Sequence, residues 1–450
     1  MPTPPTTIAP TRALATTRLG VGTVLLLVFV LVSSGPFGVE EMVSTSGPGL
    51  ALLLILLVPL VWGIPLALIC TELASAIPDE GGAYVWVERG LGPFWAFQSG
   101  WWSTLSGLVD TALYAVLAAA YANAWLGWPG PGRWLLSVGV IAAFAVLNVR
   151  SFRSMALSSA GFALVILAPC AVMTVLGVAA WRSSPFVPLT VPGQSVATGV
   201  GLGLTVAIWF YSGYESMSTM AGEVADPRRV IPRALLLSIP AVVAVYFLPT
   251  AAGLASVGRW DEWSADAGFT LVDVARVLGG SALALAMMAA ALVSSLALYN
   301  AYLASCARTT LVMAERRLLP RVFGAVHPRF GTPHGSILVA AALHALLAIA
   351  PFEALLVVDV FLFVLSYLLI FVSVVVLRVR EPRLDRPYRI PVGTAGLAVV
   401  AAAPTLVAAV FLVANGLEAL LVGLIAAATG PPVYALIRRA ARATDRGRAR

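Results

Sequence analysis

A run of apolar residues near the start of the chain is interrupted by a short polar segment and two carboxylates. The run begins at Leu19, and the interruption reads Leu31-Val32-Ser33-Ser34-Gly35-Pro36-Phe37-Gly38-Val39-Glu40-Glu41. The glycines loosen a helix and the proline removes an N–H donor. In lipid, backbone polar groups must be satisfied, so such a break is tolerated only inside protein or beside a water-filled cavity. The break therefore predicts a membrane span whose middle lines a binding site.

The composition supports a membrane protein. The 450 residues are 60% hydrophobic and 11% charged, with a mean hydropathy of +0.93, whereas a soluble domain is about half apolar and a quarter charged. Residues 1–17 are rich in Pro and Thr and have no apolar core, so we expect a disordered cytoplasmic N-terminus and not a cleavable signal peptide. The three cysteines are dispersed in apolar runs and suggest packing residues, with neither a disulfide framework nor a metal site.

Twelve apolar stretches are long enough to cross a bilayer, which takes about 20 residues. They cover residues 19–45, 49–77, 93–126, 133–149, 155–181, 196–223, 232–257, 281–313, 335–351, 355–379, 395–414 and 416–437. The chain has no lysine, and with the N-terminus inside, nearly all arginines fall on the cytoplasmic side; the exceptions are Arg133, Arg182, Arg259 and Arg276. This bias supports the span count and predicts that both termini, including the Arg-rich tail 438–450, are cytoplasmic.

Span six carries a second break of the same kind. The segment Tyr211-Ser212-Gly213-Tyr214-Glu215-Ser216 places small and polar residues and a carboxylate inside an apolar run. Breaks at matching positions of two five-span groups are typical of an inverted repeat with a site at the membrane midplane. We therefore expect an all-α polytopic membrane protein with one five-helix repeat at 18–181, a second at 182–394 and two further helices at 395–437.

Acids within the spans are candidate site residues, because a charge at bilayer depth costs roughly 2.5–3.5 kcal/mol on insertion scales. Asp110 shares a helical face with Ser106 and Tyr114, so this stripe is expected to line a cavity or, alternatively, to make an interhelical hydrogen bond. Glu215 begins the second half of span six, where a helix N-terminus favours an anion, and is a candidate to bind an amine or carry a proton; the alternative is that it only stabilises the break.

Each of several other polar residues in or near the spans has two possible roles. One of Glu40 and Glu41 is expected to face the cavity and the other an outer vestibule. Asp359, near the outer end of span ten, is interpreted as a gate or structural pair, and Tyr299 of span eight as either a packing or a lining residue. The charged residues at the cytoplasmic mouth of span six form either an inner gate or a solvated loop; they are Glu223, Asp226, Arg228, Arg229 and Arg233.

Several function classes are disfavoured by missing motifs. The sequence has no GxxxxGK[ST] pattern for ATP hydrolysis, no repeated filter segment of a channel and no metal spacing among its three histidines. The alternating glycines at 199, 201 and 203 follow no strand, so they indicate close helix packing instead of a dinucleotide site. We therefore expect a secondary transporter, not an enzyme, without cofactor or metal.

Six short motifs, in order, resemble those of the amino acid–polyamine–organocation superfamily. They are Ser34–Glu40, Glu80–Val87, Gly213–Ser216, Ala221–Val224 with Pro227 and Pro232, Met313–Arg316 with Leu319 and Pro320, and Arg386–Gly393. The resemblance runs from about residue 20 to 400 and implies a LeuT-type fold, with ten core helices in a five-plus-five inverted repeat and two added C-terminal helices. The chain is most similar to the polyamine-uptake branch, through the first break, the segment from Ser106 to Tyr114 and the Arg386–Gly393 loop.

The resemblance also suggests roles for residues. In many members the first break offers N–H groups to a substrate carboxylate, but here two glutamates add negative charge, which suits a polyamine, and Trp209 lies at the position of a gating aromatic. The expected substrate-binding residues are Ser33, Ser34, Gly35, Phe37, Gly38, Glu40, Asp110, Tyr114, Trp209, Phe210, Ser212, Gly213, Tyr214, Glu215 and Tyr299. The expected coupling or gate residues are Glu215, Asp110, Glu223, Arg228 and Arg233.

The predicted function is alternating-access import of a polyamine or related organic cation across the plasma membrane, coupled to protons as a symporter through Glu215 or Asp110. Spans eight and ten hold few acids, so a neutral or cationic amino-acid permease or exchanger is the alternative, and hydroxyls at Ser294 and Ser295 keep sodium open as the coupling ion. A ligand sensor that does not transport is a remote alternative, because the tail is too short for an output domain. The expected partners are the small-molecule substrate, the coupling ion and the bilayer, with no nucleic acid.

Overall fold

The computed structural model of the chain describes residues 35–78, 82–128, 131–150, 159–214, 227–264, 269–315 and 320–448, together with Gly22, Leu25, Phe29 and Ser33. Among these residues the regular elements are helices, apart from isolated bridges near Trp263 and Phe269. The all-α prediction is therefore confirmed.

The first helices are α2 (Val39–Ser46), α3 (Pro48–Val58), the π-helical η1 (Pro59–Gly63), α4 (Ile64–Ala76), α5 (Ala83–Leu91), α6 (Pro93–Leu126), α7 (Gly132–Arg150), α8 (Ser159–Ala179) and α9 (Val196–Phe210). The remaining helices are α10 (Pro227–Ser256), η3 (Trp260–Glu262), α11 (Leu271–Glu315), η4 (Arg321–Gly324), α12 (His334–Leu347), α13 (Phe352–Arg380), α14 (Thr394–Ala414), α15 (Gly416–Ala428) and α16 (Gly430–Arg448).

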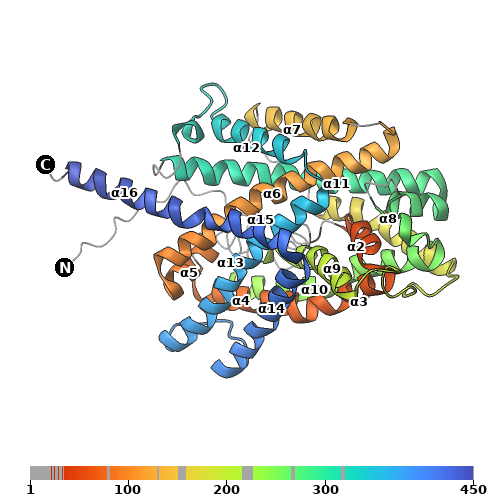
Figure 1. Cartoon of the computed structure of the whole chain (residues 1–450), viewed down its shortest axis with the longest axis horizontal. Helices are drawn as coiled ribbons and strands as arrows, with labels where there is room; N and C mark the ends of the chain where they lie inside the picture. The colour runs from red at the N-terminus through yellow and green to blue at the C-terminus, as the bar shows by residue number, and fades with distance from the viewer. Residues whose placement is uncertain are drawn as a thin grey trace.

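Each of spans two to twelve of the predicted set contains an apolar helix among the described residues; span two comprises α3, η1 and α4, and span twelve comprises α15 and the start of α16. Eight helices within the described ranges are long and apolar enough to cross a membrane, and α8, α9 and α12 contribute three shorter apolar stretches. The first predicted span is described mainly through α2, its second half. The helix α13 packs against α6, which also packs against α11, while α7 and α12 lie side by side at one edge and α16 projects from the body (Figure 1).

The helix α9 shows how the sequence determines local structure and packing. Its first turn is capped by Ser195, whose Oγ accepts a hydrogen bond of 3.1 Å from the backbone N–H of Thr198. On its buried face, a Cβ added at Gly201 would lie 2.6 Å from the carbonyl oxygen of Ala414, and one at Gly203 would lie 2.6 Å from the hydroxyl of Ser46. These glycines therefore allow close helix packing, as predicted.

The helix α11 is divided by a single glycine. Gly280 has φ 69° and interrupts the helical geometry, so residues 271–279 form a separate segment before the predicted start of span eight at 281. A positive φ of this size is readily adopted only by glycine, which explains the bend. The segment begins at Leu271, whose backbone N–H points to the end of the first span, as described below.

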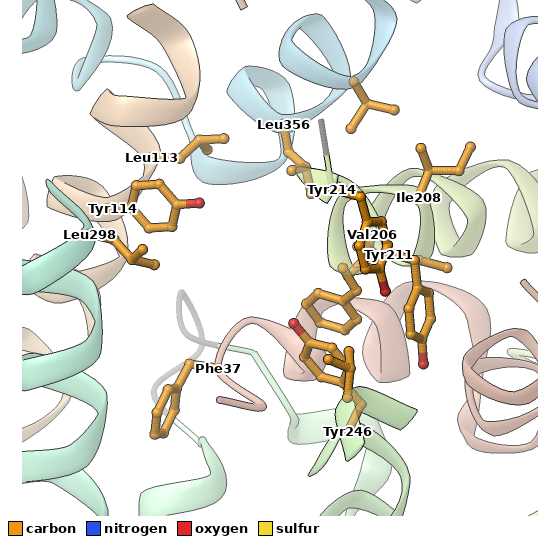
Figure 2. Close-up of a cluster of buried hydrophobic side chains, with 14 of the residues drawn as sticks. Phe37, Leu113, Tyr114, Val206, Ile208, Tyr211, Tyr214, Tyr246, Leu298 and Leu356 are labelled. Atoms are coloured by element: carbon orange, nitrogen blue, oxygen red, sulfur yellow. The ribbon is translucent and has the colours of Figure 1, made fainter. Parts of the chain in front are cut away.

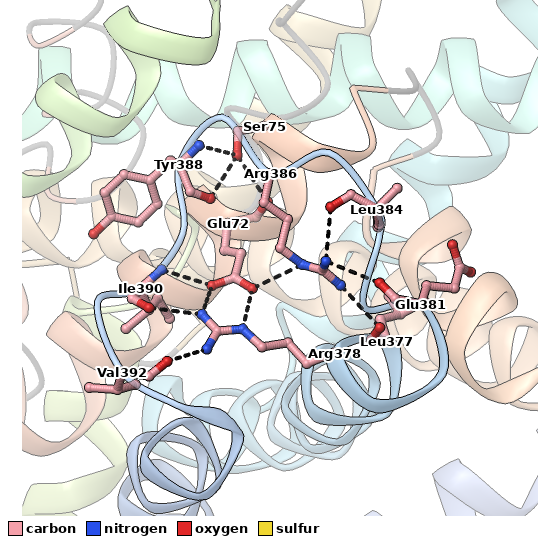
Figure 3. Close-up of polar contacts among 10 residues, drawn as sticks. All are labelled: Glu72, Ser75, Leu377, Arg378, Glu381, Leu384, Arg386, Tyr388, Ile390 and Val392. Carbon is pink, nitrogen blue, oxygen red and sulfur yellow. Dashed lines mark hydrogen bonds and ion pairs between the residues drawn. The ribbon is translucent and has the colours of Figure 1, made fainter.

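A polar network fastens the loop after α13 to the ends of α4 and α13 (Figure 3). At its centre, the buried Glu72 carboxylate accepts hydrogen bonds of 2.8 and 2.5 Å from the Arg378 guanidinium and one of 2.9 Å from the backbone N–H of Ile390. Arg386 approaches the same carboxylate at 3.4 Å. Arg378 also donates to the carbonyl oxygens of Ile390 and Val392. The buried charges of Glu72 and Arg378 are tolerated because they pair with each other and make further hydrogen bonds with the loop.

Candidate functional site

A cavity of about 230 Å³ lies between the helices that carry the predicted site. Its lining residues come from Ser33 of the first break, from Ser212 and Gly213 of the second, and from α5, α6, α9, α10, α11 and α13. They are Ser33, Ala83, Ser103, Ser106, Gly107, Asp110, Tyr114, Trp209, Phe210, Ser212, Gly213, Tyr246, Leu298, Tyr302, Asp359, Phe363, Ser366, Tyr367 and Ile370. The Ser106, Asp110 and Tyr114 stripe lines the cavity, as its spacing on α6 predicts.

The two broken spans meet at this cavity. Ser33 of the first break accepts a hydrogen bond of 3.1 Å on its carbonyl oxygen from the Tyr246 hydroxyl. Gly213 of the second break, at φ 96°, donates its N–H to the Tyr367 hydroxyl at 3.0 Å. Ser212 accepts a hydrogen bond of 3.2 Å from the Trp62 indole. Side chains of neighbouring helices therefore satisfy the backbone and hydroxyl groups that the interruptions free.

Two carboxylates from different helices face the cavity. Asp110 of α6 accepts a hydrogen bond of 3.0 Å from the indole N–H of Trp209. Asp359 of α13 is 1% exposed, and its Oδ1 accepts a hydrogen bond of 2.5 Å from the hydroxyl of Ser106, one helical turn before Asp110. The Oδ2 of Asp359 has no hydrogen-bond partner in the described part of the chain. The contact between α6 and α13 therefore brings two carboxyl groups to one cavity.

Aromatic rings surround the acids. Tyr114 stacks on Tyr302 with centroids 5.6 Å apart and lies 6.0 Å from the ring of Trp209. Phe210 and Tyr246 stack at 3.9 Å on another side of the cavity. In Figure 2 the hydroxyl of Tyr114 points into the space between the helices, opposite the Tyr246 ring. Such faces can bind a cation through their π electrons as well as apolar methylene groups.

Glu40 does not line the cavity. Its carboxylate accepts hydrogen bonds of 2.8 Å from the Tyr121 hydroxyl, 3.0 Å from the Leu271 backbone N–H and 3.0 Å from the Gly38 backbone N–H. Glu41 is also buried and accepts hydrogen bonds from the Ser264 hydroxyl at 3.0 and 3.2 Å. Both glutamates thus join α2 to the connection between α10 and α11, which differs from the expectation that one of them faces the cavity. The reason is that the start of α11 folds over the end of the first span.

The other predicted residues divide into three groups. Gly35, Phe37, Gly38, Tyr214 and Tyr299 are described but do not line the cavity. Tyr299 instead lies with its hydroxyl 3.2 Å from Nδ1 of the buried His344, which supports its packing interpretation. Arg233 is exposed near the start of α10. Ser34, Glu215 and Glu223 lie outside the described residues, as does the side chain of Arg228.

Several lining residues were not among the expected binding residues. Asp359 is the most informative of them. The sequence shows that it is an acid within an apolar span, but it does not show that Ser106 of α6 is its hydrogen-bond partner. The hydroxyls of Ser103 and Ser366 lie 2.8 Å apart, and that of Ser366 lies 2.7 Å from Ser99. Ser99, Ser103 and Ser106 continue the Asp110 stripe along α6, so their helical spacing could have indicated this extension.

Comparisons with known proteins point to membrane transporters. The chain is 35% identical over 412 residues to polyamine transporter PUT1 of Oryza sativa subsp. japonica, covering 90% of this chain and 76% of the relative. It is 32% identical over 413 residues to polyamine transporter RMV1 of Arabidopsis thaliana, covering 91% and 83%. It is also 32% identical over 386 residues to an uncharacterized transporter of Mycobacterium tuberculosis, covering 85% and 83%.

The comparisons confirm the resemblance inferred from the sequence motifs. The family profile described as amino acid permease matches residues 24–430, which is most of the chain. Together with the apolar helices, this match identifies a multi-pass membrane protein that transports and is not an enzyme. The chain belongs to the amino acid permease family.

Proposed function

We propose that this permease imports polyamines across the plasma membrane. The observation that carries the proposal is the pair of carboxylates, Asp110 and Asp359, in a cavity whose described lining contains no arginine or histidine. Acids retained at membrane depth usually face a substrate or ion path. A ligand with several ammonium groups and apolar methylene links matches both the acids and the aromatic walls. The names of the plant relatives support this substrate class.

The first break favours an amine over an amino acid. An amino-acid substrate needs donors for its carboxylate, and the N–H groups of a broken span are the usual source. Here the Gly38 N–H donates to Glu40 at 3.0 Å and to the Tyr121 hydroxyl at 3.2 Å, and the Gly35 N–H points to the Ser33 hydroxyl at 3.4 Å. These described N–H donors already have acceptors within the protein, so a carboxylate ligand would have to displace those acceptors.

The contacts around the cavity support an inward-facing state. Glu40 and Glu41 fasten α2 to the α10–α11 connection, which the arginine distribution predicts to be extracellular. The cavity lining reaches Ala83 of α5 and the exposed Ser103 on the opposite side, predicted to be cytoplasmic. Closure at one side and access at the other is the geometry of an alternating-access carrier. The proposal places both termini in the cytoplasm. It also includes coupling to protons, and the sequence predicts Glu215 or Asp110 as the residue that carries the proton.

Uptake into proteoliposomes tests the substrate class. The full-length protein is reconstituted, and uptake of labelled putrescine, spermidine, arginine and leucine is compared with that of protein-free vesicles. We expect uptake of both polyamines, and a loss of about tenfold or more in Asp110→Asn, because removing one partner of a buried charge pair costs about 2 kcal/mol or more. Asp261→Asn, at an exposed acid, is the matched control and should transport normally. Uptake of leucine or arginine without polyamine uptake would overturn the proposal.

A further inference from the structure

Asp359 is a buried acid whose charge is not balanced by its described neighbours. Its side chain is almost fully inaccessible, and Oδ1 receives one hydrogen bond, from the Ser106 hydroxyl, while Oδ2 has no partner among the described residues. A charged carboxylate that is buried without a counter-ion is strongly unfavourable, so it binds a cation or takes up a proton. A serine hydroxyl can either donate or accept, which makes Ser106 compatible with both forms.

The titratable groups around Asp359 provide no counter-ion among the described residues, so it must still either bind a cation or take up a proton. The titratable groups of the lining, from α6, α10, α11 and α13, are Asp110, Tyr114, Tyr246, Tyr302 and Tyr367. The sequences of α9 and α14 contain no titratable side chain, and Glu418 of α15 is exposed. Glu72 of α4 pairs with Arg378, near the end of α13 opposite to Asp359, and Arg89 of α5 pairs with Glu381, directly after that end. No described cationic side chain therefore faces Asp359, and its nearest acid, Asp110, opposes a second negative charge.

We propose that Asp359 binds a proton when the cavity is empty and a substrate ammonium group when it is filled, so that proton and polyamine exchange at one carboxylate. This inference rests on the proposed function. When the amine binds, the O–H bond of Asp359 breaks, the proton leaves to the water of the cavity, and the carboxylate pairs with the incoming ammonium. Asp110 keeps its hydrogen bond from Trp209 and is the second amine partner.

Competition for one carboxylate determines the direction of coupling. A carrier that holds either the proton or the amine at Asp359 moves the two in opposite directions, in contrast to the symport predicted from the sequence. Polyamines carry several positive charges, so exchange for a single proton still moves net positive charge with the polyamine. A membrane potential that is negative inside therefore drives import even though a proton leaves.

The serine stripe provides a polar route to the carboxylate. Ser106 binds Asp359, and Ser103, one turn away on α6, lines the cavity and is exposed. Ser103 also lies within 2.8 Å of Ser366, which in turn lies within 2.7 Å of Ser99. The hydroxyls of Ser103, Ser106 and Ser366 line the cavity, which also reaches Ala83 of α5, so a proton released at Asp359 meets polar groups there.

A pH-sensitive dye enclosed in proteoliposomes distinguishes exchange from symport. With the membrane potential clamped at zero by potassium and valinomycin, external spermidine should make the interior more alkaline as labelled spermidine enters. Asp359→Asn should abolish the pH change, Asp359→Glu should restore part of it, and Asp261→Asn should leave it unchanged. Acidification of the interior, or a normal pH change in Asp359→Asn, would overturn the proposal.

Infrared difference spectroscopy tests the protonated acid without requiring transport. The amine-free wild-type protein should show the carbonyl stretch of a buried protonated carboxyl group; Asp359→Asn should lack it, and Ser106→Ala should shift it. Asp110→Asn and Asp261→Asn should retain it, and circular dichroism confirms that each variant is folded. If wild-type protein takes up no spermidine but shows this band at Asp359, the proposed function fails and the protonation of Asp359 stands. If no such band is present, or it persists in Asp359→Asn, the inference fails whether or not spermidine is transported.

Discussion

At the scale of single residues, Glu40 shows how the partners of an acid determine its role. Its carboxylate receives donors from α6, from the start of α11 and from the first break itself. Gly38, at φ 93°, turns the chain so that its own N–H reaches this carboxylate. Glu40 is therefore placed to stabilise the closed arrangement of the first span, while Asp110 and Asp359 remain to meet a substrate.

The variant Glu40→Gln should lower the stability of this state. An amide in place of the carboxylate presents an NH₂ group to positions that already hold donors, and each lost hydrogen bond to a charged group is worth about 1.5–3 kcal/mol. We expect a clear fall in the thermal unfolding midpoint of the purified protein. The exposed Glu353→Gln should change it little, and equal midpoints for the two variants would contradict this role.

The sequence predicts cavity-lining residues correctly where they share one face of one helix. Ser106, Asp110 and Tyr114 are related by helical spacing alone, and all three line the cavity. Glu40 and Asp359 were harder to interpret, because their partners at Leu271 and Ser106 are more than two hundred residues away along the chain. Nothing in the local sequence shows which helix end covers a given acid.

At the scale of elements, the loop after α13 is held by a buried cluster and a surface pair. The buried cluster joins Glu72 of α4 to Arg378 and Arg386. The surface pair joins Arg89 of α5 to Glu381, with distances of 2.9 and 2.6 Å and side chains that are 41% and 33% exposed. The two should contribute differently, since water screens only the second.

Breaking the buried cluster should cost far more than breaking the surface pair. Glu72→Gln leaves two arginines without a charged partner, and removing one member of a buried pair typically costs 3–5 kcal/mol. Arg89→Gln should cost less than about 1 kcal/mol, because exposed pairs contribute little. Thermal unfolding of the two variants measures the difference, and similar losses would show that the loop is not held through Glu72.

The surface pair should also respond to acid. The hydrogen bond from Arg89 lowers the pKa of the Glu381 carboxyl below its ordinary value of 4.5. A carboxyl with a lowered pKa in the folded state stabilises that state above its ordinary pKa, and the contribution disappears as the pH falls through the lowered value. The unfolding midpoints of wild type and Arg89→Gln should therefore differ slightly at neutral pH and converge as the pH falls through the lowered pKa of Glu381. A difference that grows in acid would contradict the sign.

Element boundaries were well predicted because hydrophobic length is a local property. The predicted spans at 93–126 and 395–414 match α6 and α14 to within one residue. The segment at 271–279 was not predicted as helix, since it is short and lies before the bend at Gly280. The inverted repeat suggested by the two breaks stays a prediction, supported by the meeting of Ser33 and Gly213 at one cavity.

At the scale of the whole molecule, the proposed carrier is closed on the α2 side and accessible on the α5 side. A substrate with several positive charges then moves net charge as the carrier alternates. The driving force from the membrane potential is about 2.3 kcal/mol per elementary charge for each 100 mV. The potential should therefore matter more for a polyamine with more charges.

Imposed potentials in proteoliposomes test this electrogenic transport. An interior-negative potassium diffusion potential should accelerate uptake of both spermidine and putrescine, and the effect should be larger for spermidine, the trication. Protein-free vesicles with the same potential are the control for leak. Uptake rates that do not change with potential would contradict net movement of positive charge.

A cryo-EM structure of the full-length protein with spermidine shows whether the cavity binds a polyamine through Asp110 and Asp359. We predict a ligand in the cavity with ammonium nitrogens within hydrogen-bonding distance of both carboxylates and methylene groups against Tyr114 and Trp209. A ligand bound instead at Glu40, or an amino-acid carboxylate bound at the Gly35 and Gly38 N–H groups with no ligand at the two aspartates, would contradict it.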